Sequence, residues 1–247
     1  MNIRIVRFTK LDGSVPFTIC HAIVKLQQTP PFTPGEIASI FTEALKKIAA
    51  AVSYARHNAL RTAALVLFLR YSGLRISDAV GCRVEWVTPG KDGKDGYVDL
   101  WTRKNNVRVH VSLPQYVIDT LDRVPRMSEG RWFWTDTGKI ETAVKDWQGR
   151  LAQLFKDAGI EGGHAHRFRD TFAVAMLEEG KTLQDVADRL GITLAVAQKH
   201  YNPWSKRRQE QANADVRVTW ANDPFLKMLE AEARGTSEVR EKVERLQ

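Results

Sequence analysis

The chain has 247 residues, enough for one large domain or two small ones, and its 43% hydrophobic and 27% charged residues argue against a fibrous, disordered or membrane-spanning class. A formal net charge of +8 and a pI of about 9.6 favour an anionic partner, nucleic acid before an anionic membrane, without deciding between the two. The cysteines, Cys20 and Cys82, form no close pair, which argues against a disulfide framework or a zinc module and for a reducing cytoplasm.

The first predicted helix begins after a proline-rich segment at residues 30–34. Thr33 followed by Pro34 and Glu36 is typical of a helix start, with a capping threonine and a proline in the first turn. A domain is therefore expected to begin at residue 30. Residues 1–29 have weak periodicity, which leaves a short strand pair and a partly ordered arm or domain remnant both open.

Two core helices and a hairpin are predicted next. Apolar residues are dense at 37–50 and 58–71, too dense for a surface face. Residues 97–101 and 108–113 alternate or are β-branched, which predicts two strands joined by a turn at Lys104-Asn105-Asn106. Lys104 is then expected near the tip of this hairpin.

The second half of the chain is predicted to be mainly helical. A helix at 115–123 is followed by an aromatic strand candidate at 131–135 and a helical stripe at 144–158, closed by Gly159. Three more helices follow, separated by glycines and with threonine N-caps on the last two, at residues 171–179, 182–190 and 193–201.

The expected fold is mainly α-helical with a small antiparallel β-sheet, an α+β class. Its body covers residues 30–221, and a mixed-charge tail at residues 222–247 favours a helix. A basic run, Lys206-Arg207-Arg208, precedes the tail. The pattern therefore predicts one body with a short segment at each end.

Arg75 lies just after a glycine turn, at the expected start of a new helix. An arginine there can present its planar guanidinium to a phosphate, and the helix N-terminus adds to the attraction. On this segment alone, a surface arginine paired with Asp78 is the more frequent arrangement.

His166 and Arg169 stand three residues apart at the start of a predicted helix, which places both side chains on one face and turns Phe168 toward the core. This pair suits proton transfer beside a phosphate clamp. Surface histidines at 164 and 166 are the simpler alternative, and a metal site is less favoured because no third ligand has suitable spacing. Tyr201 ends an amphipathic helix, where a lone tyrosine usually serves packing.

Taken in chain order, these segments resemble the tyrosine recombinase, or phage integrase, family over roughly residues 32–220. The motifs are Ser-Gly-Leu-Arg-Ile-Ser-Asp at 72–78, the hairpin lysine at 104, His-x-x-Arg-Asp-Thr-Phe-Ala at 166–173, Leu-Gly at 190–191, and then Tyr201. The resemblance implies the catalytic-domain fold of that family, with the catalytic residues Arg75, Lys104, His166, Arg169 and Tyr201. It implies supporting positions at Asp78 and Asp170, where Asp170 replaces a frequent histidine or lysine.

Two departures from the family pattern bear on activity. The Leu-Gly-His of the family is Leu190-Gly191-Ile192 here, and isoleucine cannot donate the hydrogen bond that helps to hold the phosphate. Losing one such donor typically costs about a hundredfold or more in rate, so reduced activity is expected, while Ile192 could still support the site through packing. The family usually carries a helical DNA-binding domain before the catalytic one, and with residues 1–29 in its place that clamp is expected to be absent or truncated.

The resemblance implies that the protein cleaves and rejoins double-stranded DNA through a 3′-phosphotyrosyl intermediate, without a metal or nucleotide cofactor. The two arginines would hold the phosphate, His166 would assist loss of the Tyr201 proton, and Lys104 would protonate the departing 5′ oxygen. The expected partners are double-stranded DNA and further copies of the chain, up to a tetramer on DNA. No membrane partner is expected, and the expected location is the cytoplasm, at the nucleoid.

Three alternatives stay open. Residues 183–193 followed by Ala197 also resemble a helix-turn-helix, so a non-catalytic DNA-binding regulator is a rival, although it would not need the distant arginines, lysine and histidine in that order. A degenerate recombinase that only binds DNA is the more serious rival, and Ile192 favours it. A nicking enzyme similar to type IB topoisomerases would share the chemistry, and strand exchange between two duplexes would distinguish it.

Overall fold

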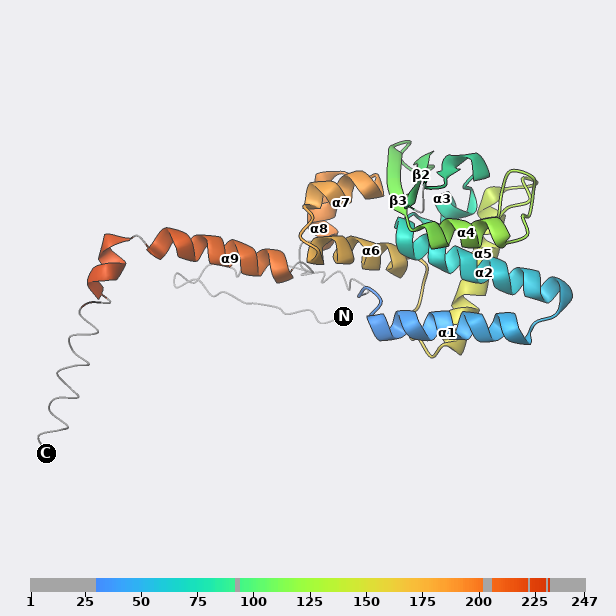
Figure 1. Cartoon of the computed structure of the whole chain (residues 1–247), viewed down its shortest axis with the longest axis horizontal. Helices are drawn as coiled ribbons and strands as arrows, with labels where there is room; N and C mark the ends of the chain where they lie inside the picture. Colours follow the sequence, from blue (N-terminus) through green and yellow to red (C-terminus); the bar gives the residue numbers. More distant parts are fainter. Residues whose placement is uncertain (1–29, 92–93, 202–205, 222, 230, 232–247) are drawn as a thin grey trace, which may run out of the picture.

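The computed structural model describes residues 30–91, 94–201, 206–221, 223–229 and 231, so the expected arm at 1–29 and most of the expected tail lie outside the described residues. The described elements are α1 (Pro34–Ala50), α2 (Ser53–Ser72), α3 (Ile76–Val80), η1 (Val84–Trp86), β1 (Val87–Thr88), β2 (Gly96–Trp101), β3 (Arg108–Leu113), α4 (Gln115–Arg123), α5 (Ile140–Asp157), α6 (His166–Glu178), α7 (Leu183–Leu190), α8 (Leu194–Tyr201) and α9 (Lys206–Ala221). The mainly helical fold with a small antiparallel sheet is confirmed (Figure 1). Within these ranges, every helix is too short or too polar to cross a membrane.

The start of α1 is fixed by its own cap and by a buried arginine of α6. Thr33 accepts a hydrogen bond from the Glu36 amide, and the Glu36 carboxylate accepts one from the Thr33 amide at 2.7 Å, as the capping pattern predicts. Arg167 is 3% exposed, lies over the Phe32 ring, and donates to the Pro30 carbonyl and to Glu36 at 2.8 Å each. These contacts hold the N-terminal end of α1 against α6.

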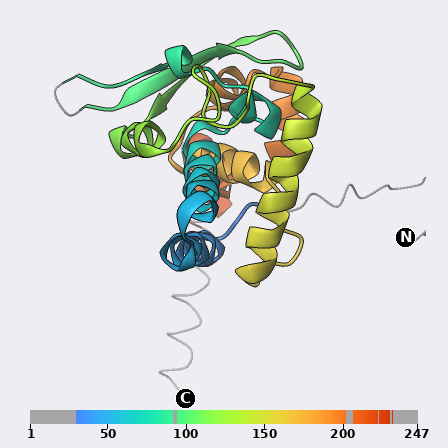
Figure 2. The same ribbon diagram turned by 90° about the vertical axis from the view of Figure 1, so that its right-hand side faces the viewer.

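The second half of helix α2 lies at the centre of the molecule, because apolar residues there occupy most of its faces. Residues 63–66, 68 and 69 are all buried, a pattern that suits a helix surrounded by others. It packs against α1, α4 and α6, and Figure 2 shows it in the middle, with α5 to one side and the sheet above. Gly73 ends α2 with a φ of 63°, a left-handed conformation that favours glycine, as expected.

The sheet has the order β1-β2-β3, and all its pairs are antiparallel. The predicted hairpin is confirmed, with Tyr97 opposite Ser112 and Trp101 opposite Arg108. Val109, Val111 and Leu113 face the core in strict alternation, which sets the register of β3. Strand β1 has only two residues, too few for a sequence pattern to reveal.

The strand predicted at residues 131–135 is wrong. Its backbone makes a single bridge, between Ser128 and Arg131, inside an irregular loop. Trp132 and Phe133 are buried as separate anchors, and the Phe133 carbonyl accepts a hydrogen bond from the Trp147 ring nitrogen at 2.6 Å. A short aromatic run therefore indicated burial correctly and the backbone conformation incorrectly.

A second, smaller hydrophobic cluster packs helices α6, α7 and α8 together. Its buried members come from α6, α7 and α8: Ala173, Leu177, Leu183, Val186, Ala187, Leu190, Ala197 and Tyr201. Thr182 and Thr193 accept hydrogen bonds from amides of the first turns of α7 and α8, which confirms both as N-caps. Helix α9, which the sequence did not predict, contacts α6 and then extends away from the body (Figure 1).

Candidate active site

Arg75 precedes α3 and carries a buried nitrogen that has no hydrogen-bond partner in the described part of the chain. This Nη1 atom lies 3.9 Å from Oδ2 of Asp78, which is an ion pair too long for a hydrogen bond. The other Asp78 oxygen accepts a hydrogen bond from the Arg103 amide at 2.8 Å. A buried guanidinium donor left unsatisfied is costly, so Arg75 is suited to receive an anion.

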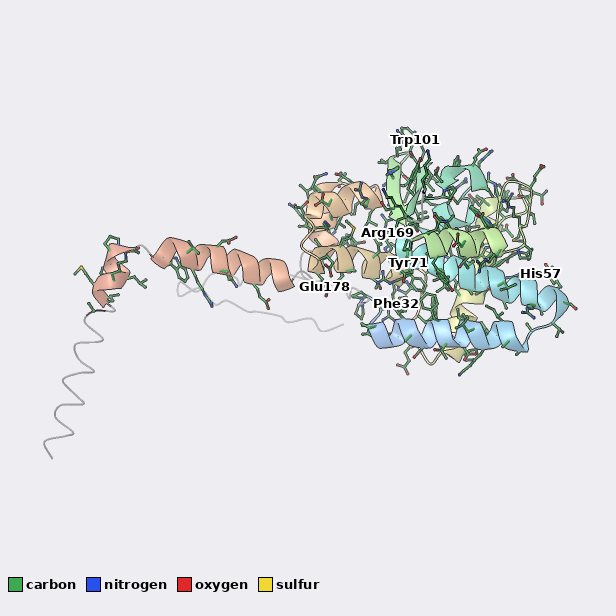
Figure 3. All side chains as sticks on the ribbon, viewed as in Figure 1. Phe32, His57, Tyr71, Trp101, Arg169 and Glu178 are labelled. Carbon is green, nitrogen blue, oxygen red and sulfur yellow. The ribbon has the colours of Figure 1, made fainter. Side chains whose placement is uncertain are left out.

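Arg169 joins two distant turns at the centre of the site. Its side chain is buried, with Nη1 donating to the Gly73 carbonyl at 2.9 Å and Nη2 to the Leu190 carbonyl at 2.6 Å. Figure 3 labels it in the interior, between the sheet and the helices. Burial and the positive charge of nearby Arg75 lower the pKa of Arg169 to about 10, so it is still protonated at neutral pH.

Tyr201 ends α8 and contacts the helix that carries Arg169. It is 4% exposed, and its hydroxyl donates a hydrogen bond to Oδ1 of Asp170 at 3.2 Å. Burial and the negative charge of Asp170 raise the pKa of Tyr201 to about 12. In the free protein the tyrosine is therefore protonated and bound to a carboxylate.

His166 lies one helical turn before Asp170, and its Nε2 atom is 3.8 Å from the same Asp170 oxygen. Loss of solvation and the charges of Arg169 and Arg75 lower the pKa of His166 to about 4. Its side chain is 55% exposed, so water offsets part of the solvation effect, whereas repulsion from the buried arginine charges persists. The imidazole is therefore neutral near pH 7.

Lys104 lies exposed in the hairpin turn between β2 and β3, as the sequence predicts. Thr102 shapes this turn, because its amide donates a hydrogen bond to the Val107 carbonyl and its hydroxyl oxygen accepts one from the Val107 amide. Asn105 then donates a hydrogen bond to the Gly191 carbonyl at 3.2 Å. The turn that carries Lys104 is thereby attached next to Leu190, the residue that Arg169 binds.

Ile192 packs beside the candidate site, at the end of α7. Gly191 closes α7 with a φ of 59°, and the Ile192 amide donates to the Ala187 carbonyl at 3.0 Å. The Ile192 side chain is partly buried against the second hydrophobic cluster. A side chain at 191 would meet Val109 of the hairpin at 2.8 Å, which explains the glycine there.

A cleft of about 520 Å³ opens beside these residues. Its walls include Arg75, His164 and His166 on one side and Val144, Gln148 and Ala152 of α5 on the other. Another cleft, of about 480 Å³, is lined mainly by alanines between α1, α2 and α5 and adjoins none of the candidate site residues. The first cleft therefore adjoins Arg75 and His166, whereas Arg169 and Tyr201 do not line it.

Sequence reasoning missed the residues that hold this site together. Arg103 and Asn105 bind Asp78 and Gly191, and Arg169 binds two carbonyls, yet none of these partners is near in sequence. In the sequence, Asn105-Asn106 indicated only a turn and not the contact of Asn105 with Gly191. The contact between Asp170 and Tyr201 also had no sequence signal, because it joins two helices that are separated by α7.

A comparison with protein-family models matches residues 39–206 to the phage integrase family. Among solved structures, the XerH site-specific recombinase bound to palindromic difH substrate in a post-cleavage complex is 18% identical, with a TM-score of 0.59 over 76% of this chain and 53% of that chain. XerA recombinase is 16% identical, with a TM-score of 0.54 over 76% of this chain and 65% of that chain. At these identities the likeness shows the fold, and this chain spans between about half and two thirds of those lengths. A search of curated proteins found no match.

Proposed function

The chain belongs to the phage integrase family, and from that premise we propose that it is a site-specific recombinase that cleaves and rejoins double-stranded DNA, with Tyr201 as the nucleophile. The unpartnered buried nitrogen of Arg75 supports this most directly, because it stands in electrostatic contact with both Arg169 and His166. Two guanidinium groups, a neutral imidazole and a tyrosine hydroxyl then form one cluster. That set suits a phosphodiester, whose charge grows in the transition state.

The two arginines hold the phosphate through its non-bridging oxygens. Each Nη atom of Arg169 carries two hydrogens and uses one for a backbone carbonyl, and the same guanidinium also interacts with the Tyr201 hydroxyl. Arg75 supplies the nitrogen that has no partner in the described residues. Because both groups are already fixed by the fold, they stabilise the developing charge without a large reorganisation.

Proton transfer has to accompany the attack. With a pKa of about 12, the free Tyr201 hydroxyl does not ionise at neutral pH. His166 assists its loss of a proton, and Lys104 gives a proton to the departing 5′ oxygen. The bond between phosphorus and the 5′ oxygen breaks as the bond to Tyr201 forms, leaving a 3′-phosphotyrosyl link that conserves the energy of the phosphodiester.

A 5′ hydroxyl from a second duplex then attacks the link and releases Tyr201. This exchange needs further copies of the chain assembled on DNA, so we propose self-association there, as many as four copies at the nucleoid. The similar XerH recombinase was solved bound to its difH DNA substrate, which supports DNA as the partner. A metal ion or nucleotide is not needed for the energy balance, because one phosphodiester is replaced by another.

A catalytically degenerate DNA-binding protein is the second candidate. Ile192 favours it, because this side chain has no hydrogen-bond donor where the related motif has histidine or tryptophan. The hydrogen bond that holds the protonated Tyr201 hydroxyl on Asp170 is also compatible with a non-catalytic DNA-binding protein. The two candidates differ in one observable, a covalent protein–DNA adduct.

The decisive experiment incubates the full chain with nicked suicide duplexes drawn from DNA flanking its own gene. The recombinase reading predicts an adduct that survives denaturation, and Tyr201→Phe abolishes it while the fold and duplex binding persist, because only the hydroxyl is removed. Tyr116→Phe is the matched control, since Tyr116 is 69% exposed on α4 and should leave the adduct intact.

Two outcomes contradict these assignments. An adduct that persists in Tyr201→Phe makes Tyr201 the wrong nucleophile. A wild-type protein that binds duplex DNA yet gives no adduct on any substrate favours the degenerate binding protein. Strand exchange between two duplexes separates a recombinase from a nicking enzyme of the type IB topoisomerase kind.

A further inference from the structure

The proton of Tyr201 points to a carboxylate. The Tyr201 hydroxyl lies 3.2 Å from Oδ1 of Asp170, and Nε2 of His166 lies 3.8 Å from that same oxygen. The distance to His166 exceeds that of a direct hydrogen bond, and a small side-chain rotation or one bridging water would close it. Asp170 therefore stands between the nucleophile and the histidine.

The groups that face Asp170 come from three segments. His166 and Arg169 share its helix, His164 lies in the preceding loop, and His200 and Tyr201 belong to α8. An arginine can only donate hydrogen bonds, whereas an ionised carboxylate can only accept them. The neutral histidines also carry an acceptor nitrogen, but the acceptor that the Tyr201 hydroxyl reaches, at 3.2 Å, is Oδ1 of Asp170.

We propose that Asp170 is the immediate proton acceptor for Tyr201 during cleavage and that His166 then shares or takes up this proton from Asp170. This assignment rests on the proposed function. In the step, the Tyr201 oxygen bonds to phosphorus, its proton passes to Oδ1 of Asp170, and the bond to the 5′ oxygen breaks as that oxygen takes a proton from Lys104. Charge and atoms balance without any further reactant.

The surroundings of Asp170 suit a base. Burial raises the pKa of this carboxyl group, against the influence of the Tyr201 hydrogen bond and the neighbouring histidine and arginine charges. A higher pKa makes an ionised carboxylate a stronger proton acceptor. His166, whose pKa is lowered to about 4, is neutral near pH 7 and can share a hydrogen bond.

The test measures single-turnover cleavage of a suicide duplex against pH for wild type, Asp170→Asn, Asp170→His and the control Asp188→Asn, which alters an exposed carboxylate on α7. Asp170→Asn should slow cleavage by about 10²- to 10⁴-fold and lose the acidic limb of the wild-type profile, since an amide cannot accept the proton. Asp170→His should recover part of the rate, with its acidic limb nearer pH ~6.5, the usual histidine value. Asp188→Asn should match wild type.

A second measurement reads the contact without cleavage. Tyrosinate absorbance, taken as the difference between proteins with and without Tyr201→Phe, should give a lower Tyr201 pKa in the Asp170→Asn background, because the nearby negative charge is gone. An unchanged Tyr201 pKa contradicts the contact, even if the Asn variant is too unstable for kinetics.

The kinetic outcomes keep the two proposals apart. A wild-type adduct combined with an Asp170→Asn variant that cleaves at the wild-type rate and pH dependence overturns the Asp170 assignment alone. Faster cleavage by Asp170→Asn overturns it too, because Asp170 would then restrain the tyrosine. A wild-type protein that forms no adduct contradicts the proposed function and the proton-acceptor role together.

Discussion

At the scale of single residues, a substitution at position 192 can test whether this side chain serves packing only or also limits the cleavage rate. Ile192 packs against the second hydrophobic cluster beside the Leu190 carbonyl that Arg169 binds. Ile192→His would restore a donor near the phosphate, which would act mainly in the transition state. We expect faster cleavage, by about tenfold or more, with nearly unchanged DNA affinity. Single-turnover rates and fluorescence anisotropy measure the two quantities.

Ile192→Val is the matched control, because it keeps an apolar β-branched side chain and adds no donor. It should cleave at the wild-type rate. If Ile192→His folds normally, cleaves no faster and binds no differently, Ile192 is only a packing residue and the missing donor does not limit the reaction.

Sequence order could nominate candidate site residues, but it could not nominate their hydrogen-bond partners. Arg75, His166, Arg169 and Tyr201 could be nominated because a motif order marks them, and their surroundings in the structure link them electrostatically. Their hydrogen-bond partners could not be nominated. Backbone carbonyls such as those of Gly73 and Leu190 have no residue-type signal, and only the folded chain brings them to Arg169.

At the scale of elements, hydrophobic periodicity predicted most helices and the hairpin. It failed where buried side chains belong to a segment without regular backbone structure. The helix at 115–123 and the strand at 108–113 have the expected bounds, because each has a clear period and a turn at its ends. The loop at 131–135 has buried aromatic side chains and no regular backbone pairing. Helix α9 has few buried contacts, so it had no apolar stripe to reveal it.

Gly73 is the element boundary on which the site depends most. It ends α2 with positive φ, and a methyl group there would lie 2.5 Å from the Phe172 ring and 2.9 Å from Leu190. Gly73→Ala should lower the free energy of unfolding by about 2–4 kcal/mol, from left-handed strain and overpacking together. Urea unfolding monitored by circular dichroism measures the change.

Gly180→Ala is the matched control, since Gly180 also follows a helix with positive φ but has no atom within 4 Å of the added carbon. It should cost only the strain, about 1–2 kcal/mol. Equal losses in the two variants would mean that the packing of Gly73 against Phe172 and Leu190 is loose, and that Arg169 is held less firmly than the structure indicates.

At the scale of the whole molecule, the site is assembled from segments spread over most of the body. The α2–α3 turn supplies Arg75, the hairpin supplies Lys104, and α6 and α8 supply the remaining groups. Three of these groups, Arg75, Lys104 and Arg169, are basic side chains, in a chain with a formal net charge of +8. We therefore expect contacts with the DNA phosphates to contribute more to binding than contacts with the bases.

Salt should consequently weaken DNA binding steeply. Each phosphate neutralised on duplex DNA contributes a slope of about −0.9 in log affinity against log salt, so two arginines on phosphate give about −1.8. Raising salt from about 50 to about 200 mM, a fourfold change, should then lower affinity at least about tenfold, as measured by anisotropy with a labelled duplex. Arg75→Ala should make the slope shallower by about one, whereas Arg150→Ala should not, because Arg150 lies over the Trp147 ring beside the other cleft. A nearly flat salt response of the wild type would contradict a phosphate-binding surface, and an equal effect of both variants would move that surface away from Arg75.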